Sequence, residues 1–248
     1  MRRLITHSLA VLALSAAASG SARAGEDPHR RLVIGGECEA CDFSGANLAG
    51  AHFGGGDFSA TSFSDAQLLG ARFTGIALDG GAFDDAVLAE TEFLDASLNG
   101  ADLTDADLTR TRIRGSSMSG ADLRGAVLAE ADLFDVGLDG ADLNGASLQD
   151  AALRHVVLSG AQARGADLSR AHLADTDLSA ADLRNASFNG GLLERVTFQS
   201  ADLRHADFTG ARLRRVDFSN ADLRNARGLS DTLLANACAD APAMLPDG

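Results

Sequence analysis

Two cysteines of this chain, Cys38 and Cys41, have the Cys-x-x-Cys spacing that occurs in zinc sites and in thiol–disulfide redox motifs. A structural zinc site needs four ligands, and neither a second cysteine pair nor a cluster of histidines accompanies this one. A redox motif needs an accessible thiolate on an α/β fold, and the rest of the sequence gives no indication of that fold. We therefore expect no metal site and no cofactor.

The other residues that could do chemistry are scattered along the chain. The histidines His52, His155, His172 and His205 lack the spacing of metal ligands, and the glycines form no nucleotide-binding loop. Serine and aspartate are abundant, but they recur as parts of a repeat that no inserted loop interrupts. Tryptophan and tyrosine, which are favoured in binding hot spots, are absent. We expect no catalytic residues and no enzyme.

The repeat has a period of five residues. Starting at Phe43 and stepping by five to Leu223, 36 of 37 positions hold a large apolar residue, and the exception is Ala163. A small residue, most often alanine, stands two positions before most of them, as in Ala101-Asp102-Leu103. Residues two apart in extended backbone point to the same side, so the small and the large residue both face inward. The acid or amide between them faces water, and the last two residues turn the chain.

A longer period of 20 residues lies over the period of five. Phenylalanine recurs at this interval in two sets ten residues out of phase, and alanine forms an unbroken series from Ala46 to Ala226. Four units of five therefore make one turn of a four-sided coil. A three-sided coil would scramble both series.

These units resemble those of the pentapeptide-repeat family, and the resemblance covers about residues 38–226. It implies an all-β fold, a right-handed quadrilateral β-helix with one pentapeptide on each side and short helical caps. The 37 units would make about nine coils and a rod about 44 Å long at the usual strand spacing.

Both ends of such a rod need caps, because they expose apolar core and unpaired strand edges. We expect a cap in residues 25–37, with a short helix that starts at Asp27-Pro28 and places Leu32, Val33 or Ile34 over the first coil. Residues 227–248 are predicted to form a second helical cap and tail. The alternative for this tail is a homodimer contact.

Residues 1–24 have a positive start, a short apolar stretch and a small-x-small cleavage site, which is typical of a signal peptide. The mature chain is expected to start near Gly25 and to be periplasmic or secreted, without stable membrane insertion after cleavage. An uncleaved membrane anchor is the alternative.

In register, Cys38 takes a large inward position and Cys41 a small one. In an oxidising compartment we expect a disulfide between Cys38 and Cys41 that fastens the first coil, with two reduced core cysteines as the alternative. Cys238 is about 40 Å away by the coil spacing, so it is either buried in the cap or paired between chains.

The charge is strongly negative and unevenly placed. The chain carries −14, and loss of Arg2, Arg3 and Arg23 with the signal peptide would leave −17. Between Glu37 and Leu108, Arg72 is the only arginine among fourteen acids. This charge opposes binding to nucleic acid. Further along, Asp and Arg columns predict alternating charge ladders along the rod: Asp102, Asp122, Asp142, Asp182, Asp202 and Asp222, with Arg124, Arg164, Arg184, Arg204 and Arg224.

These features favour a non-catalytic structural or protein-interaction module of the cell envelope, with a protein partner that the sequence does not name. The resemblance implies an alternative, because some pentapeptide-repeat proteins are acidic rods that imitate DNA and protect DNA gyrase from quinolones. The net charge agrees with DNA mimicry, and the export signal opposes it.

Overall fold

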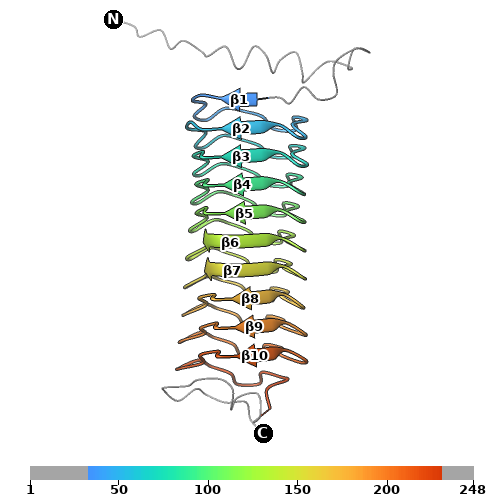
Figure 1. Ribbon diagram of the computed structural model, residues 1–248, viewed down its shortest axis with the longest axis vertical. Coiled ribbons are helices and arrows are strands. Elements are labelled where there is room, and N and C mark those ends of the chain that lie inside the picture. The colour runs from blue at the N-terminus through green and yellow to red at the C-terminus, as the bar shows by residue number, and fades with distance from the viewer. Residues whose placement is uncertain (1–32, 231–248) are drawn as a thin grey trace, which may run out of the picture.

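Ten short parallel strands stack in chain order along a straight rod in the computed structural model, which describes residues 33–230 (Figure 1). Apart from the first pair, neighbouring strands are 20 residues apart, as in the pairing of Phe53 with Phe73. The predicted β-helix of about nine coils is therefore confirmed. The strands are β1 (Val33–Gly35), β2 (His52–Gly54), β3 (Arg72–Thr74), β4 (Glu92–Leu94), β5 (Arg112–Arg114), β6 (Asp132–Gly137), β7 (Ala152–Val157), β8 (His172–Ala174), β9 (Leu192–Glu194) and β10 (Arg212–Arg214).

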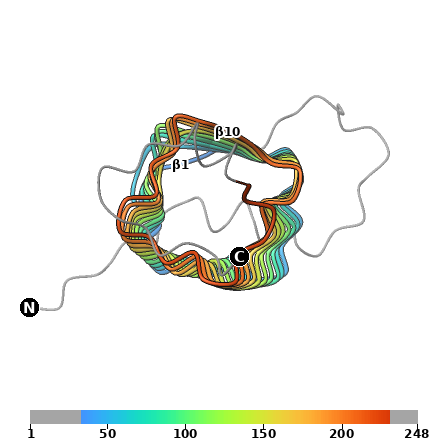
Figure 2. The ribbon, with the colours of Figure 1, turned by 90° about the horizontal axis from the view of Figure 1, so that it is seen from below.

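Each coil has four sides, which the end-on view in Figure 2 shows superimposed along the rod. We define each side by one large inward residue. The side contains the five-residue unit of that residue and the units at 20-residue intervals from it. Face A contains Phe53 and the strands, face B contains Phe58, face C contains Phe63 and face D contains Leu68. Faces B, C and D are held by parallel bridges between neighbouring coils, again 20 residues apart, as between Asp42 and Ser62.

The corners between faces use left-handed backbone. Every residue whose number is a multiple of five, from Ala40 to Asn225, has a positive φ, for example 59° at Asp65 and 57° at Arg110. Glycine adopts this conformation without strain, and Asn and Asp tolerate it better than other residues do. This explains why so many units end in Gly, Asp or Asn.

Backbone hydrogen bonds join each coil to the next. The N–H of Leu103 donates to the carbonyl of Asp122 at 2.7 Å, and the N–H of Asp122 donates to the carbonyl of Ala101 at 2.9 Å. The corner N–H of Asp105 donates to the carbonyl of Arg124 at 2.9 Å. The corner residues therefore form backbone hydrogen bonds to the next coil, as the residues in extended conformation do.

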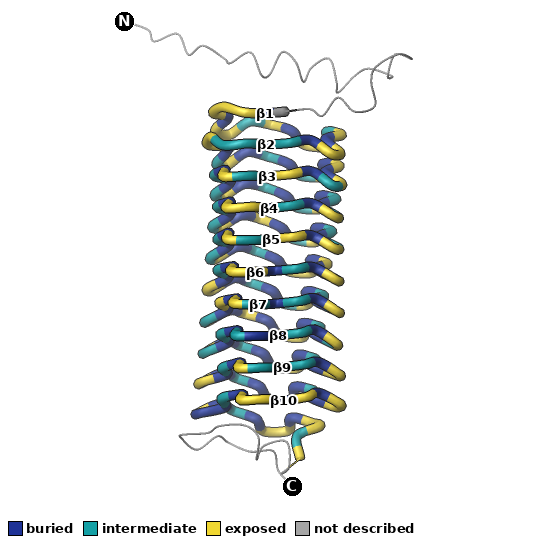
Figure 3. Tube along the Cα trace, in the orientation of Figure 1, coloured by how far each residue is buried: buried dark blue, intermediate teal, exposed yellow. Residues whose placement is uncertain are grey.

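The interior is filled by the predicted inward columns, and burial alternates along each coil in Figure 3. On face A the rings of Phe53, Phe73 and Phe93 stack with centroids 4.6 and 4.9 Å apart. Near the other end, Phe188 stacks on Phe208 at 4.9 Å. Ala163 is buried with 5% of its surface exposed.

Some small inward positions hold threonine instead of alanine. The hydroxyl of Thr61 donates to the carbonyl of Cys38 at 2.7 Å, and Thr91, Thr111 and Thr176 bond in the same way to the carbonyl 23 residues earlier. All four are at most 1% exposed. Their hydroxyls are therefore satisfied within the core, as buried polar groups need to be.

The first coil corrects one expectation. Val33 and Ile34 lie in strand β1 and not at the end of a cap helix, although Ile34 does pack over the first coil with 4% exposed. β1 pairs with β2 at a 19-residue interval, so this coil is one residue short. Gly56, with φ of 86°, accommodates the shortening, because a Cβ there would lie 1.9 Å from the carbonyl oxygen of Gly36.

The other predictions for the ends lie outside the described residues. These are the signal peptide of residues 1–24, the start of the N-terminal cap, the cap helix after Ser230, and Cys238. Between Val33 and Ser230, no helix of a length and hydropathy sufficient to cross a membrane is found.

Candidate functional site

The functional groups of this rod lie on its outer faces, because the axis is filled with apolar side chains. His52, His155 and His172 lie along face A, and His205 lies on face C, so the fold does not gather the four histidines at one place. Among residues 33–230, no three His, Cys, Asp or Glu side chains are grouped so that they could hold a metal ion.

Cys38 and Cys41 occupy the inward positions predicted for them, Cys38 at the start of face B and Cys41 at the start of face C. They are joined by a disulfide in the structure, with their Cα atoms 5.5 Å apart. Cys38 belongs to the core and Cys41 packs against it. Their oxidation state in the cell stays a prediction.

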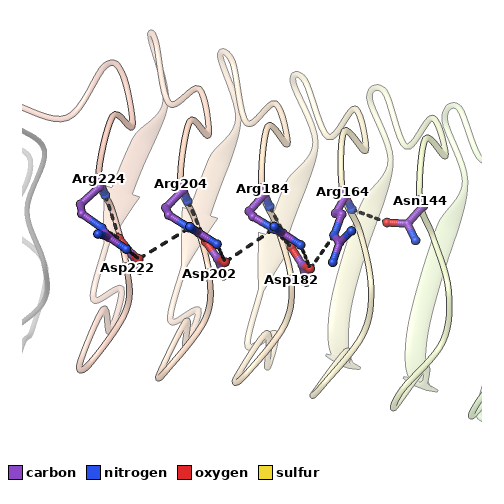
Figure 4. A network of polar contacts seen from close by, with 8 residues as sticks. All are labelled: Asn144, Arg164, Asp182, Arg184, Asp202, Arg204, Asp222 and Arg224. Carbon is purple, nitrogen blue, oxygen red and sulfur yellow. Dashed lines mark hydrogen bonds and ion pairs between the residues drawn. The ribbon is translucent and has the colours of Figure 1, made fainter.

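Face C carries a ladder of Asp and Arg side chains over its last coils (Figure 4). Arg184 donates two hydrogen bonds to Asp182 of its own coil, at 2.9 Å from Nε and 2.8 Å from Nη2. Its Nε also lies 3.6 Å from Asp202 of the next coil. Arg204 repeats both contacts one coil further on, and Arg224 repeats the first of them. The predicted ladder is confirmed over these coils. Arg184 and Arg204 pair more closely with the aspartate of their own coil than with that of the next, whereas Arg164, whose coil has Gln162 at the equivalent position, pairs with Asp182 of the next coil at 2.6 Å.

The ladder lowers the pKa values of two of its carboxyl groups, Asp182 and Asp202. Hydrogen bonds from Arg184 hold the pKa of Asp182 well below its usual range, against the opposing effect of burial, and a hydrogen bond from Arg164 adds to the lowering. Arg204 lowers the pKa of Asp202 in the same way. The guanidinium groups stay charged, and the carboxylates stay charged to lower pH than free ones would. The arginines of the face C ladder are therefore neutralised by aspartates of the same face.

Face A has a different surface. Asp132 lies between two arginines of the neighbouring coils, with Arg114 at 2.7 Å and Arg154 at 2.5 Å. Arg112 makes no ion pair within residues 33–230, and the Nε of Arg154 is buried without a hydrogen-bond partner. The arginines of this face are therefore only partly neutralised.

Phe134 on face A is the residue that sequence reasoning missed. Its side chain is 39% exposed, whereas the other eleven phenylalanines are buried. The ring meets His155 edge-on with centroids 5.5 Å apart, and the guanidinium carbon of Arg154 lies 5.9 Å from its centre. One signal could have found it, because Phe134 alone among the phenylalanines is out of phase with the five-residue period.

The charge of the four faces is unequal. Face A holds eight arginines and six acids, whereas face B holds no arginine and seven acids within residues 33–230. Face C has five arginines against eleven acids, and face D has three against six. Face A is thus the one side with a net positive charge. At its C-terminal end, a shallow depression is lined by Glu194, Arg195, Arg214 and Arg215.

A filled β-helix that presents its charges and one aromatic side chain on flat outer faces defines a solenoid repeat protein, with its faces as the surfaces available for binding. One family model, described as a pentapeptide repeat region, matches residues 46–123 and 131–207. A second, described as pentapeptide repeats in eight copies, matches residues 192–227. The chain belongs to the pentapeptide-repeat family.

Several solved structures are similar to this chain. HetL, a pentapeptide repeat protein involved in heterocyst differentiation regulation in the cyanobacterium Nostoc sp. strain PCC 7120, is 29% identical, with 82% of this chain and 90% of HetL covered and a TM-score of 0.33. Full-length QnrB1, a plasmid-mediated fluoroquinolone resistance protein, is 18% identical, with 87% and 93% covered and a TM-score of 0.31. A pentapeptide repeat protein of the Arabidopsis thaliana thylakoid lumen is 31% identical, with 48% and 68% covered and a TM-score of 0.28.

No curated protein matches the chain significantly. TM-scores this low carry no argument about function, so the functional conclusion depends on the chain's own residues.

Proposed function

We propose that this protein is a non-catalytic rod of the cell envelope that acts as a structural or protein-interaction module. The observation that carries this proposal is the uninterrupted repeat, in which every unit from 38 to 226 belongs either to a filled core or to a flat outer face. An active site would need a cavity with convergent polar groups, and a loop inserted in the repeat is the usual way to build one. Members of this family are in general structural or interaction modules.

The proposed location depends on the signal-like residues 1–24. The test is cell fractionation of the native protein, followed by intact mass. We expect it outside the cytoplasm, cleaved near Ala24, with the mass two hydrogens below that of the reduced chain because of a Cys38–Cys41 disulfide. A full-length reduced protein in the cytoplasm would overturn both the location and the disulfide.

The interaction role is tested by chemical cross-linking in intact cells, with the molar mass of the purified mature protein measured by light scattering. We expect either a reproducible cross-linked protein or a dimer, and the dimer should be lost when residues 231–248 are removed if the C-terminal end forms it. A protein that is monomeric and is never cross-linked to another protein would refute the interaction role.

A second candidate function is DNA mimicry directed at DNA gyrase. The observation that favours it is the charge of residues 33–108, which hold fourteen acids and one arginine. A gyrase supercoiling assay with the mature protein tests it. Inhibition of supercoiling, or protection from a quinolone, would support mimicry, and no effect on either would exclude it.

A further inference from the structure

Phe134 is placed where the repeat does not need an aromatic residue. It follows the inward residue Leu133 in strand β6, at an outward position that is exposed or half-buried in every described coil of face A except at Ala174, which is buried. The equivalent residues of the neighbouring coils are Arg114 and Arg154. The core would be unchanged by a polar residue there, so the packing of the rod does not explain an exposed phenylalanine.

The backbone beneath Phe134 is the most regular part of the rod. β6 and β7 are six residues long, whereas the other strands have three, and the pair continues past the corner into face B. Five residue pairs hold β6 against β7, from Asp132–Ala152 to Gly137–Val157. A rigid platform of this kind loses little conformational entropy when a partner binds.

The side chains along this column alternate between apolar and basic. Leu94, Arg114, Phe134 and Arg154 occupy one outward column in successive coils, about 4.8 Å apart. Leu94 is 36% exposed and Phe134 is 39% exposed. Aromatic and arginine side chains are enriched in the hot spots of protein interfaces, and an exposed apolar side chain beside them offers an anchor.

The charge of this column differs from that of the opposite face. On face C, Arg184, Arg204 and Arg224 each donate two hydrogen bonds to an aspartate of their own coil. On face A, Arg114 and Arg154 share the single carboxylate of Asp132. The guanidinium groups of Arg114 and Arg154 therefore retain capacity for a further carboxylate.

We propose that the column from Leu94 to Arg154 on face A is a docking surface for an acidic protein segment that places an apolar side chain against Phe134. Its carboxylates would pair with Arg114 and Arg154, and with Arg112 beside them. This inference rests on the proposed interaction role and adds to it the surface and the chemistry of the partner.

Charge complementarity favours a short protein segment over nucleic acid. Residues 33–230 carry 30 acids and 16 arginines, and face A is the one face in this range with more arginines than acids. Its excess lies in the coils after residue 190, where Arg195, Arg212, Arg214 and Arg215 stand with Glu194 as the one acid. A long polyanion that wrapped round the rod would meet the acidic faces B and C, and it would be repelled there. A segment confined to the column avoids those two faces and meets Arg112, Arg114 and Arg154. Four acids stand on face A of the same coils, Glu92, Asp95, Asp132 and Asp135; of these, Glu92 pairs with Arg72, and Asp132 pairs with Arg114 and Arg154.

The test is selection of random 12-residue peptides displayed on phage against the immobilised mature protein, followed by affinity measurements on labelled synthetic peptides by fluorescence polarisation. We expect selected peptides to combine several Asp or Glu residues with at least one apolar residue. Their affinity should fall at least tenfold in Phe134→Ser and in Arg154→Gln, and it should weaken as salt is added. These substitutions are at exposed positions, so the fold should be retained, which circular dichroism and Tm will check.

The matched controls are Leu69→Ser on face D, whose side chain is 49% exposed, and Arg204→Gln in the ladder of face C. Each should change the affinity less than twofold. The proposal is overturned if the selected peptides carry no acidic excess, if Phe134→Ser binds them as well as the wild type does, or if a 20-base-pair DNA duplex binds with the same sensitivity to Phe134→Ser. Because cross-linking in cells does not depend on face A, these failures would leave the proposed interaction role standing.

Discussion

The same substitution at two phenylalanines of face A should have very different effects on stability. Phe73 is fully buried, and its ring lies 4.6 Å from that of Phe53 and 4.9 Å from that of Phe93, centroid to centroid. Two further rings, of Phe63 and Phe83, meet it edge-on at 5.9 and 6.2 Å. Phe73→Ala therefore removes four aromatic contacts and leaves a cavity in the axis.

The magnitude follows from burial. A buried Phe→Ala substitution costs about 3–5 kcal/mol, a range that includes the loss of aromatic pairs worth about 0.5–1.5 kcal/mol each beyond their area. For a chain of this length, 1 kcal/mol shifts Tm by about 2–4 °C. Phe73→Ala should therefore lower Tm by roughly 6–20 °C. Phe134→Ala removes a ring that contacts His155 and Arg154 at the surface, and it should lower Tm by at most about 4 °C.

Differential scanning calorimetry of the mature protein measures both shifts. Phe73→Leu is a matched control, because leucine fills the equivalent position in later coils of face A, as at Leu133 and Leu153, and it should recover more than half of the loss. Since coils contact only their neighbours, hydrogen exchange of residues 53–93 shows whether the loss stays local. A Tm for Phe73→Ala within about 4 °C of the wild type, or equal to that of Phe134→Ala, would refute the account of the stacked core.

Three further predictions concern other parts of the rod. Ala163→Leu should raise Tm by about 1–8 °C, because leucine fills this inward position in the coils on either side, and a lower Tm would show that local packing already fills the space. Thr111→Val removes the hydroxyl that donates to the carbonyl of Leu88, and it should lower the free energy of unfolding in urea by about 1 kcal/mol. Thr111→Ser keeps the donor and is the control. An unchanged urea midpoint for Thr111→Val would contradict this prediction. Arg184→Gln combined with Arg204→Gln should lower Tm at pH 7 and much less at pH 2. The lowered pKa values of Asp182 and Asp202 give stability that is present above the ordinary pKa of aspartate and is lost as pH falls through the folded-state value, so a Tm difference independent of pH would be the contrary result.

The coils could be predicted in detail from the sequence because the fold repeats one local rule. Each unit needs a small and a large inward residue two apart and a corner residue that accepts positive φ. The units from Phe43 to Leu223 follow this rule without insertion, and Ala163 is the one large inward position that departs from it. The columns of stacked phenylalanines followed from the period of 20 alone. The Asp and Arg columns of face C were also predictable, because their outward positions are fixed by the same register.

Three features could not be derived from the repeat. Phe134 is out of phase with the inward positions, so a pattern search for the core passes over it. Arg184 bonds more closely to Asp182 of its own coil than to Asp202, which is decided by side-chain conformation and not by residue type. β1 joins the rod because Gly36 and Gly56 let the first coil close with one residue fewer.

The two periods have a consequence for how such a rod can change. The interior repeats every five residues, but the outer faces repeat only every 20. Loss of one pentapeptide would still present apolar residues to the axis, yet every later coil would rotate by a quarter turn relative to the earlier ones. The arginines of face C would then line up under face B, and those of face A under face D. Loss or gain of single pentapeptides during evolution could therefore place different outer faces in line with one another, in rotations of 90°, while the interior stays packed.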